Sequence, residues 1–425
     1  LTEPINTPIG AAECASYEQV KENKKAYARS CRQQYDQQDE VYGKTVIQRH
    51  GKMMLVQNPP SFSLTTEELD RIYSLPYMRA YHPSYESVGG VPGIEEVKFS
   101  ITHNRGCFGY CNFCSIALHQ GRRITCRSEE SILDEARRLT EMPDFKGYIH
   151  DVGGPTANFR KPSCEKQIKL GLCKGKKCLA PEPCPNLEAD HSEYIDILRK
   201  LRKIKGVKKV FIRSGIRYDY LMEDESDEFI KELIKNHVSG QLKVAPEHCS
   251  AAVLDKMGKP HIEAYKKFQK KFYEITKGIG KEQYLVPYLM SSHPGSTLKE
   301  AIELAVFLKE NNMRPEQVQD FYPTPGTLST CMFYTGLDPY TMEEVYVPRT
   351  PEEKKMQRTL LQYFKPENKR IVISALKKAG RTDLIGYGKN CLVTPEKNIG
   401  KAEKKNNRNV RKVGGKWRNT KGKKK

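Results

Sequence analysis

Three cysteines, Cys107, Cys111 and Cys114, lie within eight residues in the spacing Cys-x3-Cys-x2-Cys. Thiolates gathered in this way favour zinc or iron and sulfur. A short loop must turn all three side chains inward, and Gly106 and Gly109 give its backbone that freedom. A self-contained zinc or ferredoxin site usually has four ligands, so a four-iron cluster here would leave one iron open to a small molecule. A partial zinc knuckle is the alternative.

A second group of cysteines, Cys164, Cys173, Cys178 and Cys184, lies in a segment (160–190) rich in Lys, Gly and Pro. The segment has few large apolar residues, so a metal could organise it. Four thiols would complete a tetrahedral zinc site or ligate a second cluster. Unliganded thiols are the alternative, and the identity of the metal stays open.

Polar and glycine residues follow several apolar runs further along the chain. Gly153 and Gly154 would let a ligand approach the backbone closely, although a simple turn explains them equally well. Ser214, Arg217 and Glu247 come after later runs. A ribose needs acceptors for its hydroxyls and a carboxylate needs a cation, so Glu247 and Arg217 are candidates for these contacts. A salt bridge between the two is the alternative.

The elements that position these residues are predicted from about residue 95 onward. Short apolar runs alternate there with amphipathic helical patterns, which predicts a parallel sheet with helical crossovers. The candidate strands are 97–101, 148–152, 207–212, 242–245, 284–290 and 318–322. Six such units fit an α/β fold, a partial (β/α)6 TIM-like barrel. Chemistry in such barrels collects at the C-terminal ends of the strands, so the distinctive segments, each of which follows a run, are expected to line one rim.

Two helix starts carry capping signals. Ser128 is expected to cap a helix with Glu129 and Glu130 in its first turn, and Thr297 with Glu300 has the form of a capping box. A further helix is expected over 191–204.

The domain organisation follows from these patterns. We expect a lead-in over 1–90, the partial barrel with its Cys-rich insertion over 91–335 and a helical extension over 336–400. Because the chain begins at Leu1 with a connector-like stretch, it is predicted to continue a longer protein.

Charge and hydropathy limit the class of protein. The net charge is +20, and residues 401–425 hold 12 Lys and Arg against one acidic residue. This basic tail is expected to be disordered and solvated; contact with RNA or another polyanion, with Trp417 stacking on a base, is the alternative. No apolar run is long enough to span a membrane, so no membrane partner and a cytoplasmic location are predicted.

The motifs together resemble the YgiQ-like family of radical S-adenosylmethionine (SAM) enzymes, over roughly residues 60–400. They are the cysteine loop, the glycine pair, Ser-Gly-Ile-Arg at 214–217, Lys-Val-Ala-Pro-Glu-His-Cys at 243–249 and Asp-Phe-Tyr-Pro-Thr-Pro-Gly-Thr at 320–327. Phe113 matches the aromatic position before the last cysteine. Gly153-Gly154 looks like the Gly-Gly-Glu segment that holds the methionine amino group, with Pro155 in place of the acid.

The resemblance implies a [4Fe-4S] cluster on Cys107, Cys111 and Cys114, with SAM chelated to the open iron. It also implies reductive cleavage of SAM to a 5′-deoxyadenosyl radical that acts on an unknown substrate, and an electron donor of the flavodoxin or ferredoxin type. Two other classes stay open. One is a nucleic-acid-binding protein organised by zinc or iron and sulfur, and the other is an electron-transfer protein.

Overall fold

The computed structural model describes residues 1–396, so the predicted disordered tail lies outside the described residues. Its strands are β1 (Ala12–Cys14), β2 (Val46–His50), β3 (Met53–Gln57), β4 (Ser100–Thr102), β5 (Asn104–Arg105), β6 (Thr125–Cys126), β7 (Tyr148–Ile149), β8 (Asp151–Gly153), β9 (Lys209–Val210), β10 (Gln241–Glu247), β11 (Tyr284–Ser291) and β12 (Gln319–Asp320).

The α-helices are α1 (Tyr17–Glu22), α2 (Lys24–Asp36), α3 (Thr66–Tyr73), α4 (Ile94–Val97), α5 (Ile116–Gln120), α6 (Glu129–Thr140), α7 (Glu165–Leu170), α8 (Ser192–Leu201), α9 (Tyr218–Leu221), α10 (Glu228–Glu232), α11 (Ala251–Met257), α12 (Ile262–Gly278), α13 (Leu298–Glu310), α14 (Leu328–Thr335), α15 (Pro351–Leu361) and α16 (Lys369–Lys378). Short helices of other types are η1 (Pro4–Asn6), η2 (Pro83–Val88), η3 (Leu233–His237), η4 (Pro366–Asn368) and η5 (Thr382–Leu384). None of the helices within residues 1–396 combines the length and the apolar character needed to cross a bilayer.

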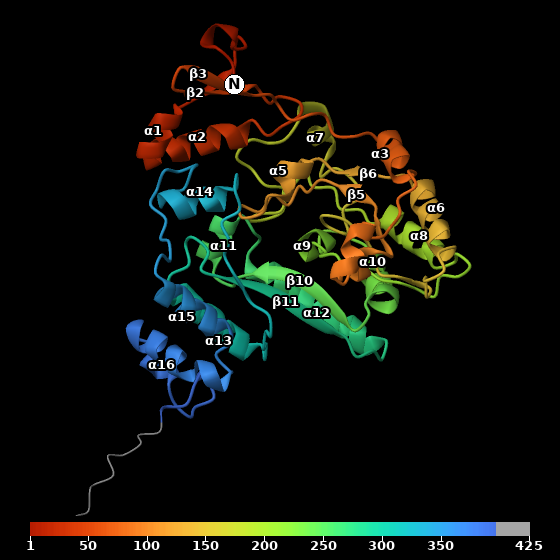
Figure 1. Cartoon of the computed structure of the whole chain (residues 1–425). Helices are drawn as coiled ribbons and strands as arrows, with labels where there is room; N and C mark the ends of the chain where they lie inside the picture. The colour runs from red at the N-terminus through yellow and green to blue at the C-terminus, as the bar shows by residue number, and fades with distance from the viewer. Residues whose placement is uncertain (397–425) are drawn as a thin grey trace, which may run out of the picture.

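All six predicted barrel strands are present, although most are shorter than predicted. The second is divided into β7, which pairs with β9, and β8, which pairs with β4; both pairs are parallel. Strands β10, β11 and β12 form a second parallel sheet, in which β10 lies at the centre of the molecule beside β11 (Figure 1). Within the described residues no ladder joins β9 to β10, so the sheet is interrupted and no closed barrel forms. The predicted α/β fold is confirmed as an open arrangement of parallel strands with helical crossovers.

The first strand departs from its predicted bounds. Val97 ends α4 and is exposed, and the strand begins only at Ser100. Glu95 and Glu96 lie in the first turn of α4, where acidic side chains interact favourably with the helix dipole. The apolar run therefore divides between a helix end and a strand start.

Both predicted helix caps are present. The Ser128 hydroxyl accepts a 3.1 Å hydrogen bond from the Ser131 amide at the start of α6. Thr297 and Glu300 form the capping box of α13. The helix predicted over 191–204 is α8, which ends at Leu201.

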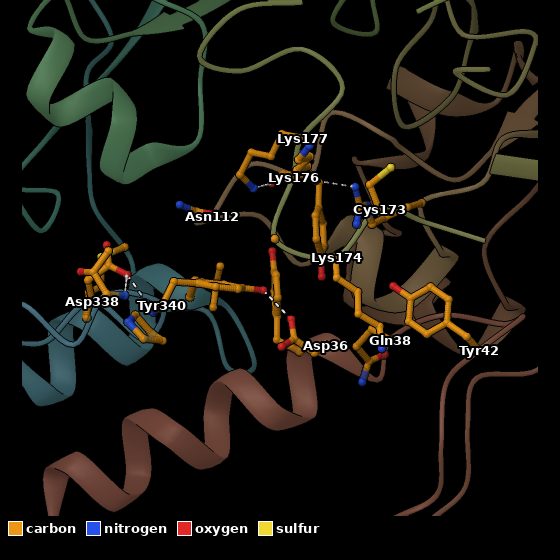
Figure 2. Close-up of a pocket in the computed structure, with 18 residues that line it drawn as sticks. Asp36, Gln38, Tyr42, Asn112, Cys173, Lys174, Lys176, Lys177, Asp338 and Tyr340 are labelled. Atoms are coloured by element: carbon orange, nitrogen blue, oxygen red, sulfur yellow. Dashed lines mark hydrogen bonds between the residues drawn. The ribbon is translucent and has the colours of Figure 1, made fainter. Parts of the chain in front are cut away.

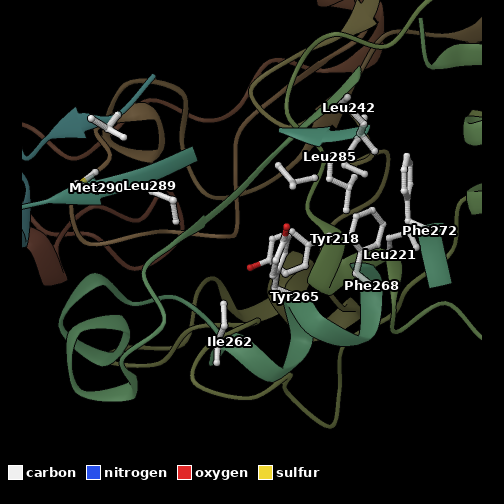
Figure 3. Close-up of a cluster of buried hydrophobic side chains, with 14 of the residues drawn as sticks. Tyr218, Leu221, Leu242, Ile262, Tyr265, Phe268, Phe272, Leu285, Leu289 and Met290 are labelled. Carbon is white, nitrogen blue, oxygen red and sulfur yellow. The ribbon is translucent and has the colours of Figure 1, made fainter. Parts of the chain in front are cut away.

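The main hydrophobic core lies between the strands and the helices that follow them. Aromatic and aliphatic side chains of α9, α12, β10 and β11 interdigitate there (Figure 3). Tyr218, Tyr265, Phe268 and Phe272 are almost completely buried, and each such side chain removes a large apolar area from water. This core holds the carboxyl ends of the strands in place.

The region before the barrel has a small sheet that the sequence patterns did not predict. Strands β1 and β2 pair in parallel, and β2 and β3 in antiparallel fashion. Helix α2 packs against α14 from the far end of the barrel, as the red and light-blue ribbons show in Figure 1. Helices α15 and α16 lie within residues 336–400, the range predicted as a helical extension.

Candidate cofactor site

The cysteine loop connects β5 to α5 and is held by its own backbone. Gly106 has a φ of 86°, and a Cβ at this position would overlap the carbonyl oxygen of Arg123. The Cys107 amide donates to the Gly121 carbonyl over 3.1 Å, and the Cys114 amide donates to the Cys111 carbonyl over 3.1 Å. Only glycine meets both the conformation and the close approach at 106.

Segments that follow several strands meet around this loop. The Cys107 thiol lies 3.6 Å from the Thr156 hydroxyl, which comes after β8. The Asn112 amide donates to the Met257 carbonyl over 2.8 Å, and the Ser329 amide donates to the Asn112 carbonyl over 2.9 Å.

The segments after β9 and β11 also reach the loop. The Arg217 guanidinium donates to the Cys111 thiol over 3.6 Å. The Phe113 ring packs edge-on against His293, with 6.1 Å between ring centroids. The structure thus brings the strand-end segments together at one rim, around the three cysteines.

A cavity of about 730 Å³ opens beside the loop. Its lining includes Asn104 and Arg105, which lead into the loop, and Asp151, Gly154 and Ser214 from the neighbouring strand ends. The volume lies within the range of roughly 300–1,000 Å³ that small-molecule sites occupy. The lining also includes Val97, Ser100 and Gln241 at or just before the amino ends of β4 and β10 and none of the three cysteines, so the cavity runs along the strands and borders the loop only at its start.

Neighbouring side chains leave no room for a Cβ at Gly153 or Gly154. A Cβ at Gly153 would overlap the Ser214 hydroxyl, and one at Gly154 would lie 2.8 Å from the Asn104 Cγ. The Ser214 amide and hydroxyl both donate to the Asp151 carboxylate. Gly153 and Gly154 thus allow Ser214 and Asn104 to approach the strand ends, and Gly154 also lines the cavity.

Arg217 and Glu247 do not form the salt bridge weighed from the sequence. Arg217 forms a buried ion pair with Asp219, with 2.8 Å between Nε and Oδ1. Glu247 is buried with a φ of 67°, a strained conformation for a residue with a side chain. Burial raises the pKa of its carboxyl, against the lowering effect of Lys259 and Arg217. Neither Arg217 nor Glu247 lines the large cavity.

Basic side chains lie near two of the three thiols: Arg217 and Lys177 near Cys111, and Lys259 near Cys114. Arg122 lies over the Tyr110 ring on the outer side of the loop. Arg122 and Lys259 are buried, Lys177 is partly buried, and none of the three has a carboxylate within ion-pair distance in residues 1–396. Burial raises the pKa of Cys114 to about 11 in the absence of a metal, with a further rise from the Cys111 and Cys107 thiols. Buried positive charges without partners are costly unless an anionic group balances them. A metal cluster on thiolates would supply that negative charge, so the residues fit such a group.

The distance between ligand sulfurs differs from one kind of metal site to another. Within the described part of the chain, no three Cys, His, Asp or Glu side chains converge closely enough to hold a single metal ion. Around one zinc the sulfurs would stand about 3.8 Å apart, because each Zn–S bond is about 2.3 Å. Thiolates of a four-iron cluster bind different irons and stand further apart. Thiolate donors suit both zinc and an iron–sulfur cluster, so the donor set fits either kind of centre.

A smaller cavity of about 160 Å³ lies on the outer side of the loop. Tyr110, whose φ is 46°, faces it and stacks on Tyr35 of α2 with 4.6 Å between ring centroids. The Arg122 guanidinium lies 4.0 Å from the centre of the same Tyr110 ring. Figure 2 shows Cys173 and Lys177 of the insertion around this cavity, with residues of α2 below them.

Several residues of the site were missed from the sequence. Asp151 is a lone charge within an apolar strand, and this signal could have identified it. Asn104 has a buried Oδ1 without a hydrogen-bond partner, next to the cavity. Lys177 and Lys259 follow no motif, so only the fold reveals their position.

Comparison with known proteins places the chain in a family. The family model described as "Radical SAM superfamily" matches residues 101–308, and the model described as "Radical SAM N-terminal" matches residues 4–100. The chain belongs to the radical SAM superfamily. Residues 316–425 match a domain of unknown function, DUF3362.

Curated relatives show to which family within the superfamily the chain belongs. The chain is 58% identical over 400 residues to UPF0313 protein CPE1196 of Clostridium perfringens, covering 94% of this chain and 60% of that protein. It is 59% identical over 381 residues to a UPF0313 protein of Clostridium botulinum, with 90% and 60% coverage. UPF0313 is the YgiQ family, so the predicted family is confirmed. The radical SAM chain spans about 60% of the length of these relatives.

Solved structures give a weaker likeness. The cobalamin-dependent SAM radical enzyme OxsB is 13% identical, with a TM-score of 0.42 over 81% of this chain and 56% of that chain. The radical SAM methyltransferase TsrM from Kitasatospora setae is 13% identical, with a TM-score of 0.35 over 65% and 46%. Such values add nothing about cofactor or substrate.

Proposed function

We propose that the chain binds a [4Fe-4S] cluster and SAM and cleaves SAM reductively, as a radical SAM enzyme. Cys107, Cys111 and Cys114 would hold three of the irons. When bound, the cluster supplies one electron to the sulfonium, whose bond to C5′ breaks to give methionine and a 5′-deoxyadenosyl radical that abstracts hydrogen from a substrate. The observation that carries the proposal is the loop of three thiols, with Arg217 in contact with Cys111 and with a 730 Å³ cavity lined by Asn104 and Arg105 at the start of the loop.

The residues near the loop have distinct jobs in this proposal. Arg217 contacts Cys111 and does not line the cavity. Its positive charge would therefore stabilise the Cys111 thiolate and not a ligand in the cavity. Gly154 and Ser214 line the cavity and leave backbone and hydroxyl groups at its wall. Glu247 is strained, and its carboxylate has no hydrogen bond within residues 1–396; it stays the predicted acceptor for a ribose hydroxyl, although it does not line the 730 Å³ cavity.

Aromatic residues of the cysteine loop would exclude water from the site. Phe113 packs against the main core, and Phe108 is fully buried in a separate apolar cluster beside the loop. Apolar walls on two sides of the thiols keep the site dry, which strengthens each electrostatic interaction within it.

The test is anaerobic reconstitution with iron and sulfide, followed by spectroscopy with and without SAM and by assay for 5′-deoxyadenosine under reductant. The chain is expected to show a cluster signal that shifts when SAM is added, and to produce 5′-deoxyadenosine and methionine. Cys111→Ala should lose the SAM-dependent shift and the product, whereas Cys391→Ala, at a partly exposed thiol outside both cysteine groups, should keep both. Normal cleavage by Cys111→Ala would refute the ligand assignment.

The other classes lead to different results in the same experiment. A zinc-organised nucleic-acid-binding protein would contain zinc and no iron, and an electron-transfer protein would hold a cluster whose signal ignores SAM. The flavodoxin- or ferredoxin-type donor and the polyanion contact of the basic tail stay predictions.

A further inference from the structure

The Cys-rich insertion lacks a core of its own. Across residues 160–190, all of which the structure describes, Leu179 is the only large apolar side chain that is fully buried. The insertion contains one short helix, α7, and is otherwise built of turns and extended segments. Ordering about 30 residues costs of order 1–2 kcal/mol each in backbone entropy, which one leucine cannot offset.

Three of its four cysteines nevertheless come together. The Cys184 amide donates to the Cys178 carbonyl over 2.9 Å, which brings the two residues side by side. The Cys178 thiol donates over 3.3 Å to the hydroxyl of Ser163, the residue before Cys164. The Cys164 and Cys184 thiols both lie within electrostatic range of Cys178. All three are partly buried, whereas Cys173 is exposed.

The group lies close to the first cysteine loop. Cys178 and Cys107 pack against the same apolar cluster, which contains Phe108, Phe159 and Tyr220. The insertion is also tied to the loop by a hydrogen bond from the Lys177 ammonium to the Tyr110 carbonyl. Two groups of thiols therefore share one apolar wall.

We propose that Cys164, Cys178 and Cys184, with Cys173 as the fourth ligand, hold a second iron–sulfur cluster. Zinc on the same four thiols is the alternative, and metal analysis separates the two. Cys173 is exposed and is joined to Cys178 by the polar stretch Lys-Gly-Lys-Lys, in which Gly175 has a φ of 62°.

The surrounding charges agree with an anionic centre. Lys177 crosses over Gly258, where an added Cβ would lie 2.9 Å from the ammonium nitrogen. The same ammonium donates to the carbonyl of Tyr110, the residue before Cys111, and Lys177 precedes Cys178 in the chain, so this side chain lies between the two thiol groups. A cation held there is stabilised by metal–thiolate centres on either side.

The test uses the full chain, reconstituted anaerobically, with iron, sulfide and zinc measured per chain and iron examined by Mössbauer spectroscopy. The wild type is expected to hold about eight irons, because each four-iron cluster contributes four. Replacing Cys107, Cys111 and Cys114 together by alanine should leave about four irons and abolish the response to SAM. Replacing Cys164, Cys178 and Cys184 together should also leave about four, with the SAM response of the first cluster retained.

Controls separate ligation from misfolding. Cys126→Ala removes a thiol that packs on the same apolar cluster but belongs to neither group, and it should keep about eight irons. Cys184→Ser is a milder change in case the triple variant does not fold, and it should lower the iron content or alter the spectrum. Cys173→Ala should do the same, and an unchanged spectrum would remove it from the ligand set.

Other results overturn the proposal. These are about four irons in the wild type, loss of all iron from the variant of the first group, or one zinc per chain with about four irons. The proposed function fails separately, if the variant of the first group still responds to SAM.

Discussion

Replacement of Gly154 by alanine is expected to lower the free energy of unfolding by about 1–3 kcal/mol, the cost of the cheaper of two ways to accommodate the added Cβ. The added Cβ would lie 2.8 Å from the Asn104 Cγ and overlap the Oδ1 of the same side chain. Asn104 is 1% exposed, and its amide group donates to the Thr156 and Phe159 carbonyls over 3.0 and 2.6 Å. If Asn104 moves away, two buried carbonyls lose their donor, at about 1–3 kcal/mol each. If it stays, overpacking costs about 1–3 kcal/mol.

The measurement is guanidinium unfolding of the metal-free chain, so that cofactor binding does not contribute. Gly215→Ala is the matched control, because nothing lies within 4 Å of an added Cβ there, and it should change stability by less than about 0.5 kcal/mol. The variant Asn104→Ala removes the group that the Cβ strikes. The double variant should therefore be about as stable as Asn104→Ala alone.

Additive effects of the two substitutions would refute this reasoning, since residues in steric conflict must couple. A stable Gly154→Ala variant would refute it as well. In either case the two explanations weighed from the sequence, a ligand that approaches the backbone or a simple turn, would remain for Gly154.

Three further changes test other parts of the site and its scaffold. Gly106→Ala should prevent cluster assembly in reconstitution assays, because the φ of 86° and the nearby Arg123 carbonyl exclude a side chain; normal iron content would contradict this. Arg217→Lys keeps the charge but cannot form the paired hydrogen bonds to its aspartate, so thermal unfolding at a temperature lower by several degrees is expected, and an unchanged midpoint would count against a structural pair. Hydrogen bonding to His237 lowers the pKa of Glu232 to about 2 in the folded chain, below the unfolded value of about 4.3. The stability that ionised Glu232 contributes is present above that unfolded value and is lost as pH falls towards 2. Between pH 5 and pH 3, the free energy of urea unfolding should therefore fall less in metal-free Glu232→Gln than in the wild type. An equal fall in both proteins would reject the lowered pKa of Glu232.

Much of the barrel could be predicted because its signals are local. Apolar periodicity identifies a strand or a helix face within a few residues, and Ser128 and Thr297 cap helices through their own hydroxyls. The grouping of strand-end motifs follows from the geometry of parallel strands, and Cys107 beside Thr156 agrees with it. The sheet of β1, β2 and β3 was missed because β1 is only three residues long and pairs with a partner more than thirty residues away.

The partners of individual charges could not be predicted. Arg217 pairs with Asp219, two residues away, and not with the more distant Glu247, because the turn into α9 directs both side chains to the same side. Lys177 and Lys259 reach the cysteine loop only through the folded path of the chain. A lysine at the surface and one beside a thiol look alike in sequence, since burial is a property of the tertiary fold.

Tyr110 lies between two cysteines of the loop, yet its ring is clamped from outside by Tyr35 and Arg122. The outer shield of the loop thus comes partly from α2, which lies some seventy residues earlier in the chain. The stacking of Tyr35 on Tyr110 therefore links the N-terminal region directly to the cysteine loop, so a change on the surface of α2 could reach the thiols without passing through the barrel.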